Sequence, residues 1–161
     1  MFKTRKQLIA TVALAACLST GTQAVLAQDH HSHHGKTTAQ LTLNNGKKWA
    51  TDDNLRQGMS RIREALAAEL PAIHSGKVSA EQYRTLAKKV NEQVEFMVQN
   101  CKLDKDADAM LHLVLTEFIA GTDAMADQKN NKAKRHGAEK ITHALESYGV
   151  YFEHPGWQGI K

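Results

Sequence analysis

The chain has 161 residues, with 21 Lys and Arg, 17 Asp and Glu, nine His and two Cys, so its formal net charge is +4 at neutral pH. The length suits one ordinary domain. A hydrophobic content of 42% excludes a disordered chain, a charged content of 24% excludes an integral membrane bundle, and two cysteines exclude a disulfide scaffold. The positive charge fits a nucleic-acid-binding protein only if it belongs to the folded part.

The first 27 residues have the layout of a secretory signal peptide. Lys3, Arg5 and Lys6 precede an apolar run from Leu8 to Leu18, and a more polar stretch then ends in Val25-Leu26-Ala27. The apolar run is shorter than the roughly 20 residues that a transmembrane helix needs, and we expect no transmembrane segment elsewhere. The sequence therefore predicts export to the periplasm with cleavage after Ala27.

Cleavage at this point makes Gln28 the first mature residue and removes three basic residues but no acidic one. The mature chain then has 18 basic and 17 acidic residues, a net charge of +1, so a nucleic-acid partner is no longer indicated. All nine histidines and Cys101 remain. The alternative is a lipoprotein signal at Leu14-Ala15-Ala16-Cys17, with a lipid attached to Cys17.

The mature chain divides into a tail and a helical domain. Residues 28–48 show no helical period and begin with a His-rich run, so we expect a flexible tail. Over residues 49–161, apolar residues recur at helical spacing in four segments. Helices are expected to start near 51–53, at the capping-box pattern of 79–82 and near 104–108, and the fourth ends before Pro155.

Four amphipathic helices of ~22 residues, each ~33 Å long, joined by short loops predict an all-α fold, an up-down-up-down antiparallel four-helix bundle. Alternating direction brings together the start of helix one, the end of helix two, the start of helix three and the end of helix four. We call this the Met/Cys end. It collects Met59, Met97, Cys101 and Met110, with His112, Tyr148, Tyr151 and His154 nearby and Trp49 and Trp157 at its flank. His74 and His136 belong to the opposite end.

The Met/Cys end has the ligand types of a soft-metal site. Thioether and thiolate sulfur, together with imidazole, suit Cu(I). The candidate ligands are Met59, Met97, Cys101, Met110 and His112. The competing interpretation makes these residues plain core, because methionine fills irregular interiors and free cysteine is among the most buried residue types.

The tail carries a second metal-binding pattern. Four histidines, His30, His31, His33 and His34, lie within five positions, and neutral imidazole is a ligand for copper, nickel and zinc. With Gln28 first, the amine, two backbone nitrogens and the His30 imidazole offer four nitrogens in a plane, which suits Cu(II) or Ni(II). The alternative is a solvated polar tail whose metal affinity is incidental.

Patterns of known catalytic sites are missing from the sequence. It has no GxSxG, P-loop, HExxH or GxGxxG motif, and we therefore predict that the protein is not an enzyme. Asp104, Asp106 and Asp108 lack the glycine and the final glutamate of a calcium loop, so we interpret them as helix-start acids.

Three stretches resemble a family of small, largely uncharacterised exported bacterial helical proteins. They are Leu43–Met59, which contains Asn44-Asn45-Gly46-Lys47-Lys48-Trp49, then Asn100-Cys101-Lys102-Leu103, and Tyr148–Trp157. The resemblance supplies no mechanism, but all three stretches fall at the predicted Met/Cys end.

The architecture is also similar to the periplasmic b-type cytochrome four-helix bundle. That family holds haem between a methionine early in helix one and a histidine late in helix four. Met59 matches the methionine, whereas the histidine position falls near Gly149 and His154 comes more than a turn later. The resemblance implies haem b as an alternative cofactor, with Met59 and His154 as its ligands.

The sequence thus predicts a periplasmic, non-enzymatic protein of transition-metal binding or homeostasis. Copper is the first choice of metal, with nickel or zinc next, and a periplasmic metal-handling protein is the expected partner. The alternatives are a haem-binding bundle and a metal-independent helical interaction or chaperone module, in which Phe96, predicted to point away from the core, belongs to a binding patch.

Overall fold

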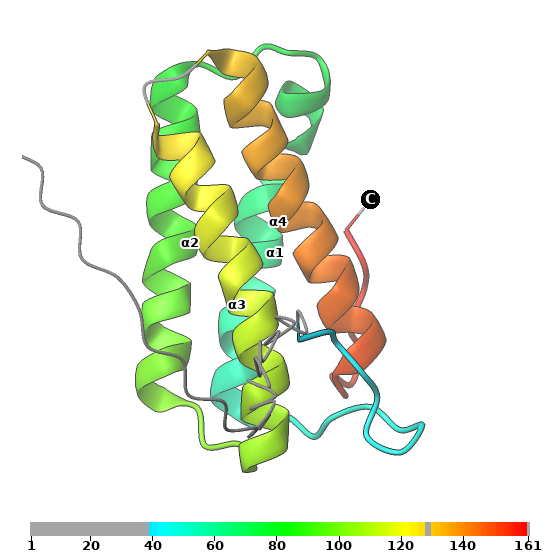
Figure 1. Cartoon of the computed structure of the whole chain (residues 1–161). Helices are drawn as coiled ribbons and strands as arrows, with labels where there is room; N and C mark the ends of the chain where they lie inside the picture. The colour runs from blue at the N-terminus through cyan, green and yellow to red at the C-terminus, as the bar shows by residue number, and fades with distance from the viewer. Residues whose placement is uncertain (1–38, 128–129, 161) are drawn as a thin grey trace, which may run out of the picture. The chain divides into compact units, whose positions relative to one another are not determined.

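The computed structural model describes residues 39–127 and 130–160. It contains four α-helices, α1 (Asp53–His74), α2 (Ala80–Asn100), α3 (Lys105–Ala126) and α4 (Asn131–Tyr151), and successive helices run in opposite directions (Figure 1). The predicted all-α four-helix bundle is therefore confirmed. The predicted signal peptide and the tail histidines His30, His31, His33 and His34 lie outside the described residues.

Side-chain caps define where three of the helices begin. The Asp52 carboxylate accepts from the backbone N–H of Leu55 at 2.7 Å and starts α1. Ser79 and Gln82 form the predicted capping box of α2, each side chain accepting from the other residue's backbone N–H. The Asn130 side chain accepts from Ala133 and starts α4. These bonds satisfy amide groups that the helices themselves leave free.

Apolar side chains from all four helices fill the centre of the bundle. The large side chains that are fully buried include Leu55, Met59, Ile62, Leu66, Tyr83, Met97, Phe118, Met125 and Tyr148. These positions recur at helical spacing, so each helix turns one face inward.

The helices α3 and α4 cross where two glycines face each other. A Cβ added to Gly137 would lie 2.5 Å from the carbonyl oxygen of Gly121, and one added to Gly121 would lie 2.8 Å from the carbonyl oxygen of Gly137. Both distances are shorter than van der Waals contact, so these two positions accept only glycine without a backbone shift. The backbones of α3 and α4 can therefore approach each other closely at Gly121 and Gly137.

Within the described part of the chain, α3 is the helix that has the length and apolar composition to cross a membrane. A core helix of a bundle meets the same criterion. Leu111, Val114, Leu115 and Phe118 of α3 are buried against the other helices.

Residues 39–48, the described part of the predicted tail, contact the bundle. Leu41 is half-buried against the core. The Thr42 carbonyl accepts from the indole N–H of Trp49 at 2.6 Å, and the Lys48 ammonium donates to the carbonyl of Gly149 at 2.7 Å. Asn45 (φ +50°) forms a tight turn with the glycine that follows it. This part of the segment therefore packs on α3 and α4.

Candidate functional site

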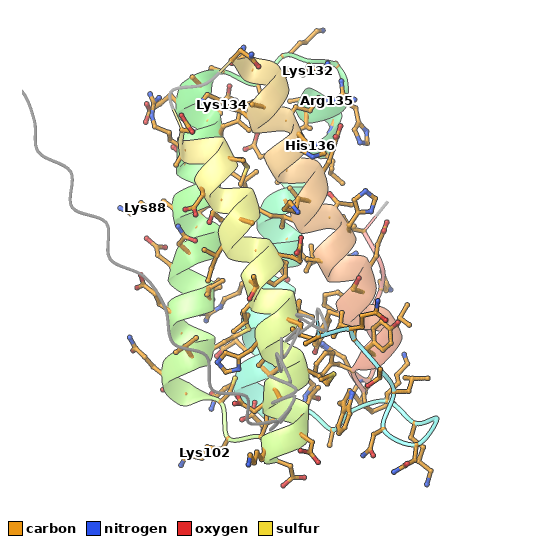
Figure 2. The ribbon with its side chains drawn as sticks, viewed as in Figure 1. Lys88, Lys102, Lys132, Lys134, Arg135 and His136 are labelled. Carbon is orange, nitrogen blue, oxygen red and sulfur yellow. The ribbon has the colours of Figure 1, made fainter. Side chains whose placement is uncertain are left out.

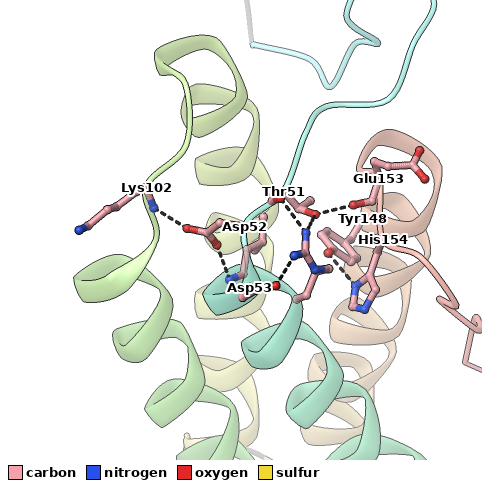
Figure 3. A network of polar contacts seen from close by, with 9 residues as sticks. Thr51, Asp52, Asp53, Lys102, Tyr148, Glu153 and His154 are labelled. Carbon is pink, nitrogen blue, oxygen red and sulfur yellow. Dashed lines mark hydrogen bonds and ion pairs between the residues drawn. The ribbon is translucent and has the colours of Figure 1, made fainter.

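The ends of three helices are joined at the Met/Cys end. Asp52, before α1, accepts from the backbone N–H of Lys102, after α2, at 2.6 Å (Figure 3). The N–H of Trp49 donates to the carbonyl of Tyr151, and the N–H of Glu153 donates to the carbonyl of Trp49, each at 2.8 Å. The start of α1 thus meets the end of α2 and the end of α4, as the topology predicts.

Two of the three candidate thioethers are in the core. Met59 and Met97 are 0% exposed. A Cβ added to Gly58 would lie 2.7 Å from Sδ of Met97, so glycine at this position lets the thioether rest against the backbone of α1 beside Met59. Met110 is half-buried, and its sulfur accepts from the Thr42 hydroxyl at 3.8 Å. The structure thus places Met97 against Gly58, the residue before Met59. Met110 lies nearer the surface.

Cys101 is a half-buried free thiol at the end of α2. Burial raises the pKa of this thiol to about 12, and the charge and hydrogen bond of Asp52 and the charge of Asp108 add to the effect. The group is therefore protonated at neutral pH. Because thiolate is the form that binds metal, an ion at Cys101 would first have to displace this proton.

Aromatic rings from α4 and the following segment close the same end. The hydroxyl of Tyr148 lies 2.9 Å from Nδ1 of His154, and the Trp157 ring contacts both rings with centroids 4.9 Å away. Burial raises the pKa of Tyr148. Burial, and then the charge of Arg56, lower the pKa of His154. The His154 imidazole is therefore held neutral at physiological pH.

Arg56 links this aromatic cluster to the start of α1. Its guanidinium donates to the carbonyl of Thr51 at 2.7 Å and to the Thr51 hydroxyl at 2.8 Å, and it pairs with Asp53. The Thr51 hydroxyl in turn donates to the carbonyl of Glu153 (Figure 3). Arg56 thus pairs with an acid of its own helix while its positive charge still acts on His154.

The positions named by the cytochrome resemblance have other neighbours here. Met59 is enclosed in the core. His154 has one ring nitrogen against Tyr148. A Cβ at Gly149 would lie 2.6 Å from Nε1 of Trp157, so the indole takes the space beside the helix position where the resemblance places a histidine.

His112 contacts Asp108 of its own helix. Its side chain is exposed, and Nδ1 lies 3.4 Å from the Asp108 carboxylate on the same helix. As the side chains stand, no three His, Cys, Asp or Glu residues in 39–127 and 130–160 are arranged to hold a metal ion. The residues brought together at this end are Cys101 with Asp52, and Tyr148 with His154 and Trp157.

Phe96 differs from its predicted position. It is partly buried and packs against the core, with the guanidinium carbon of Arg61 6.0 Å from the centroid of its ring. The helical spacing of apolar residues alone misplaces Phe96, because neighbouring side chains also cover residues at the edge of the apolar face of a helix.

Sequence reasoning also missed two roles at the Met/Cys end. The sequence predicts only a helix start near 51–53, whereas Asp52 also interacts with the Cys101 thiol and accepts from the backbone N–H of Lys102. Gly149 lies inside α4, where glycine is unfavourable, which was the available signal, and it provides the space for Trp157.

Comparisons of the chain with protein-family models, with curated proteins and with solved structures find no significant match.

Proposed function

We propose that this chain is an exported, non-enzymatic protein that binds transition-metal ions, with copper as the first choice. The observation that carries the proposal is the run of four histidines in residues 30–34, directly after an export signal. Imidazoles at this density bind Cu(II), Ni(II) or Zn(II) without a preformed pocket. In this proposal, the tail captures the ion and the bundle anchors the tail.

The Met/Cys end adds a second element to the proposal, a place for Cu(I). Met97 lies against Gly58, the residue before Met59, and the two buried thioethers offer soft sulfur ligands. A thioether binds metal without losing a proton, whereas the Cys101 thiol would have to lose one against a raised pKa. We therefore assign the Cu(I) ligand role to the two thioethers before Cys101.

A Cu(II) titration of the exported chain tests the tail. We expect the substitutions His30→Ala, His31→Ala, His33→Ala and His34→Ala together to weaken Cu(II) binding at least tenfold. The matched control is His112→Ala, since His112 is an exposed histidine of the bundle. Equal Cu(II) affinities of the unsubstituted and the tail-substituted chain would contradict the proposal that the tail captures the ion.

Competition with a Cu(I) chelator tests the thioethers. Met59→Leu and Met97→Leu should each weaken Cu(I) binding, whereas Met125→Leu should not. Met125 is an equally buried methionine at the far end of α3, and it controls for a general effect on the core. Unchanged Cu(I) affinity in both Met/Cys-end variants would leave these residues as core alone.

A further inference from the structure

The exposed face of α4 carries alternating histidines and glutamates. His136, Glu139, His143 and Glu146 follow one another at spacings of three, four and three residues. Figure 2 shows His136 near the start of α4, at the end of the bundle opposite Lys102. His136 therefore belongs to a different part of the bundle from the Met/Cys end.

One hollow on this face brings in a histidine from α1. The hollow has a volume of about 160 Å³ and lies between the end of α1 and the first half of α4. His74, the last residue of α1, lines it together with Glu139 and His143 of α4. Its floor is apolar, made by Leu70, Ile73 and Ala138. Three metal-binding side chains from two helices thus border one space.

The helix directions incline the Cα–Cβ bonds of the two histidines toward each other along the bundle. In an α-helix the Cα–Cβ bond leans toward the N-terminus of the helix. Because α1 and α4 are antiparallel (Figure 1), His74 leans toward the Met/Cys end and His143 leans away from it. Glu139 lies one turn before His143 on the same face, which is the spacing at which two side chains of a helix chelate one ion.

The present partners of these side chains are weak and exposed. His143 has Nδ1 3.1 Å from the Glu146 carboxylate, and its side chain is 77% exposed. Glu139 pairs with Arg135 at 2.9 Å and with His136 at 3.6 Å. Exposed pairs of this kind contribute little to stability, so a metal ion that binds more strongly can draw the side chains away from them.

We propose that His74, Glu139 and His143 form a second transition-metal site, which takes a divalent ion such as Zn²⁺ with two imidazoles, one carboxylate and water as ligands. Zn²⁺ accepts this ligand set in a tetrahedral arrangement. The side chains close on the ion by rotating about their own torsions. The site goes beyond the proposed function, because none of its ligands belongs to the tail or to the Met/Cys end, and it ties α1 to α4.

Zn²⁺ titration of the tail-substituted full chain tests this site separately from the tail. We expect one equivalent of Zn²⁺ to bind, with the ring NMR signals of His74 and His143 shifting together and that of His112 unmoved. His74→Ala and His143→Ala should each weaken the affinity at least tenfold, and Glu139→Gln should weaken it less. All three side chains are at the surface of the hollow, so far-ultraviolet circular dichroism should show an unchanged fold.

The outcomes separate the two metal proposals. If the tail-substituted chain binds no Zn²⁺, the bundle site is overturned while capture by the tail stands. If His74→Ala leaves the affinity unchanged, the assignment of His74 is overturned. If His136→Ala weakens it as much as His143→Ala does, the proposed set of three ligands is overturned. In a third outcome, the unsubstituted and tail-substituted chains bind metal equally and His143→Ala removes that binding. This result would support the bundle site and contradict capture by the tail.

Discussion

The hydroxyl of Tyr148, a fully buried residue of α4, lies 2.9 Å from Nδ1 of His154, six residues further along the chain. This contact holds the turn after α4 against the helix and brings Trp157 over Gly149. Burial, and then the charge of Arg56, disfavour the imidazolium form of His154 at this contact. The protonation of His154 therefore controls how well this segment is held.

Acidification is expected to weaken the bundle through His154. Burial and Arg56 lower the pKa of His154 in the folded chain below its unfolded value. The unfolded chain thus binds the proton more strongly, so the stabilisation is present above the unfolded pKa and is lost as the pH falls through it toward the folded pKa. Urea unfolding measured from pH 7.5 to pH 5 gives the free energy of unfolding at each pH. As the pH falls, this free energy should decrease less steeply in His154→Gln than in the unsubstituted protein. Parallel pH profiles of the two proteins would contradict this.

Replacing Gly137 by alanine should destabilise the protein by about 1–3 kcal/mol, the range of an overpacked core. The added methyl group would lie 2.5 Å from the carbonyl oxygen of Gly121, which is backbone and cannot rotate away. Thermal unfolding followed by circular dichroism measures the loss. Gly159→Ala is the matched control, because a Cβ there meets nothing within 4 Å. Similar melting temperatures of the two variants would mean that α3 and α4 are further apart than described.

The thiol of Cys101 should react slowly with iodoacetamide at pH 8. Its pKa of about 12 leaves little of the reactive thiolate. Asp52→Asn should speed the reaction, because it removes the negative charge beside the thiol and keeps an oxygen that can cap α1. The rate measured against pH distinguishes low thiolate content from simple shielding. A midpoint near pH 8.5 in the unsubstituted protein would contradict the raised pKa.

Lys134 should be sensitive to removal of its charge. It is 2% exposed, and its ammonium donates to the carbonyls of Met125 and Asp127 at the end of α3. A cation at a helix C-terminus satisfies carbonyls that the helix leaves free. Lys134→Met should cost about 1–3 kcal/mol, the penalty for leaving buried acceptors without a donor, whereas the exposed Lys132→Met should cost much less. Chemical denaturation of both variants checks this, and equal stabilities would contradict it.

The sequence predicts the fold well because its signals are local. The capping box at Ser79 and Gln82 and the periodic apolar residues of each helix need no knowledge of the rest of the chain, and both are confirmed. The alternating direction of the helices then predicts that the ends near Asp52 and Lys102 meet, and they do.

The chemistry of the Met/Cys end depends on contacts between distant segments. The pKa of Cys101 is raised first by burial and then by Asp52, 49 positions earlier, whose carboxylate also accepts from Lys102. Neither partner is implied by helical spacing. The hollow at His74 and His143 was likewise missed, because helical spacing on α4 alone does not say which residue of α1 faces it.

Native mass spectrometry of the exported protein, purified under non-denaturing conditions, tests metal binding by the tail most directly. We predict a chain that begins at Gln28 and carries a transition-metal ion, with copper preferred. The same measurement on the tail-substituted chain should show the loss of the metal that the tail holds. A mature chain without metal, or an equal metal content in the two proteins after exposure to Cu(II), would contradict the proposal.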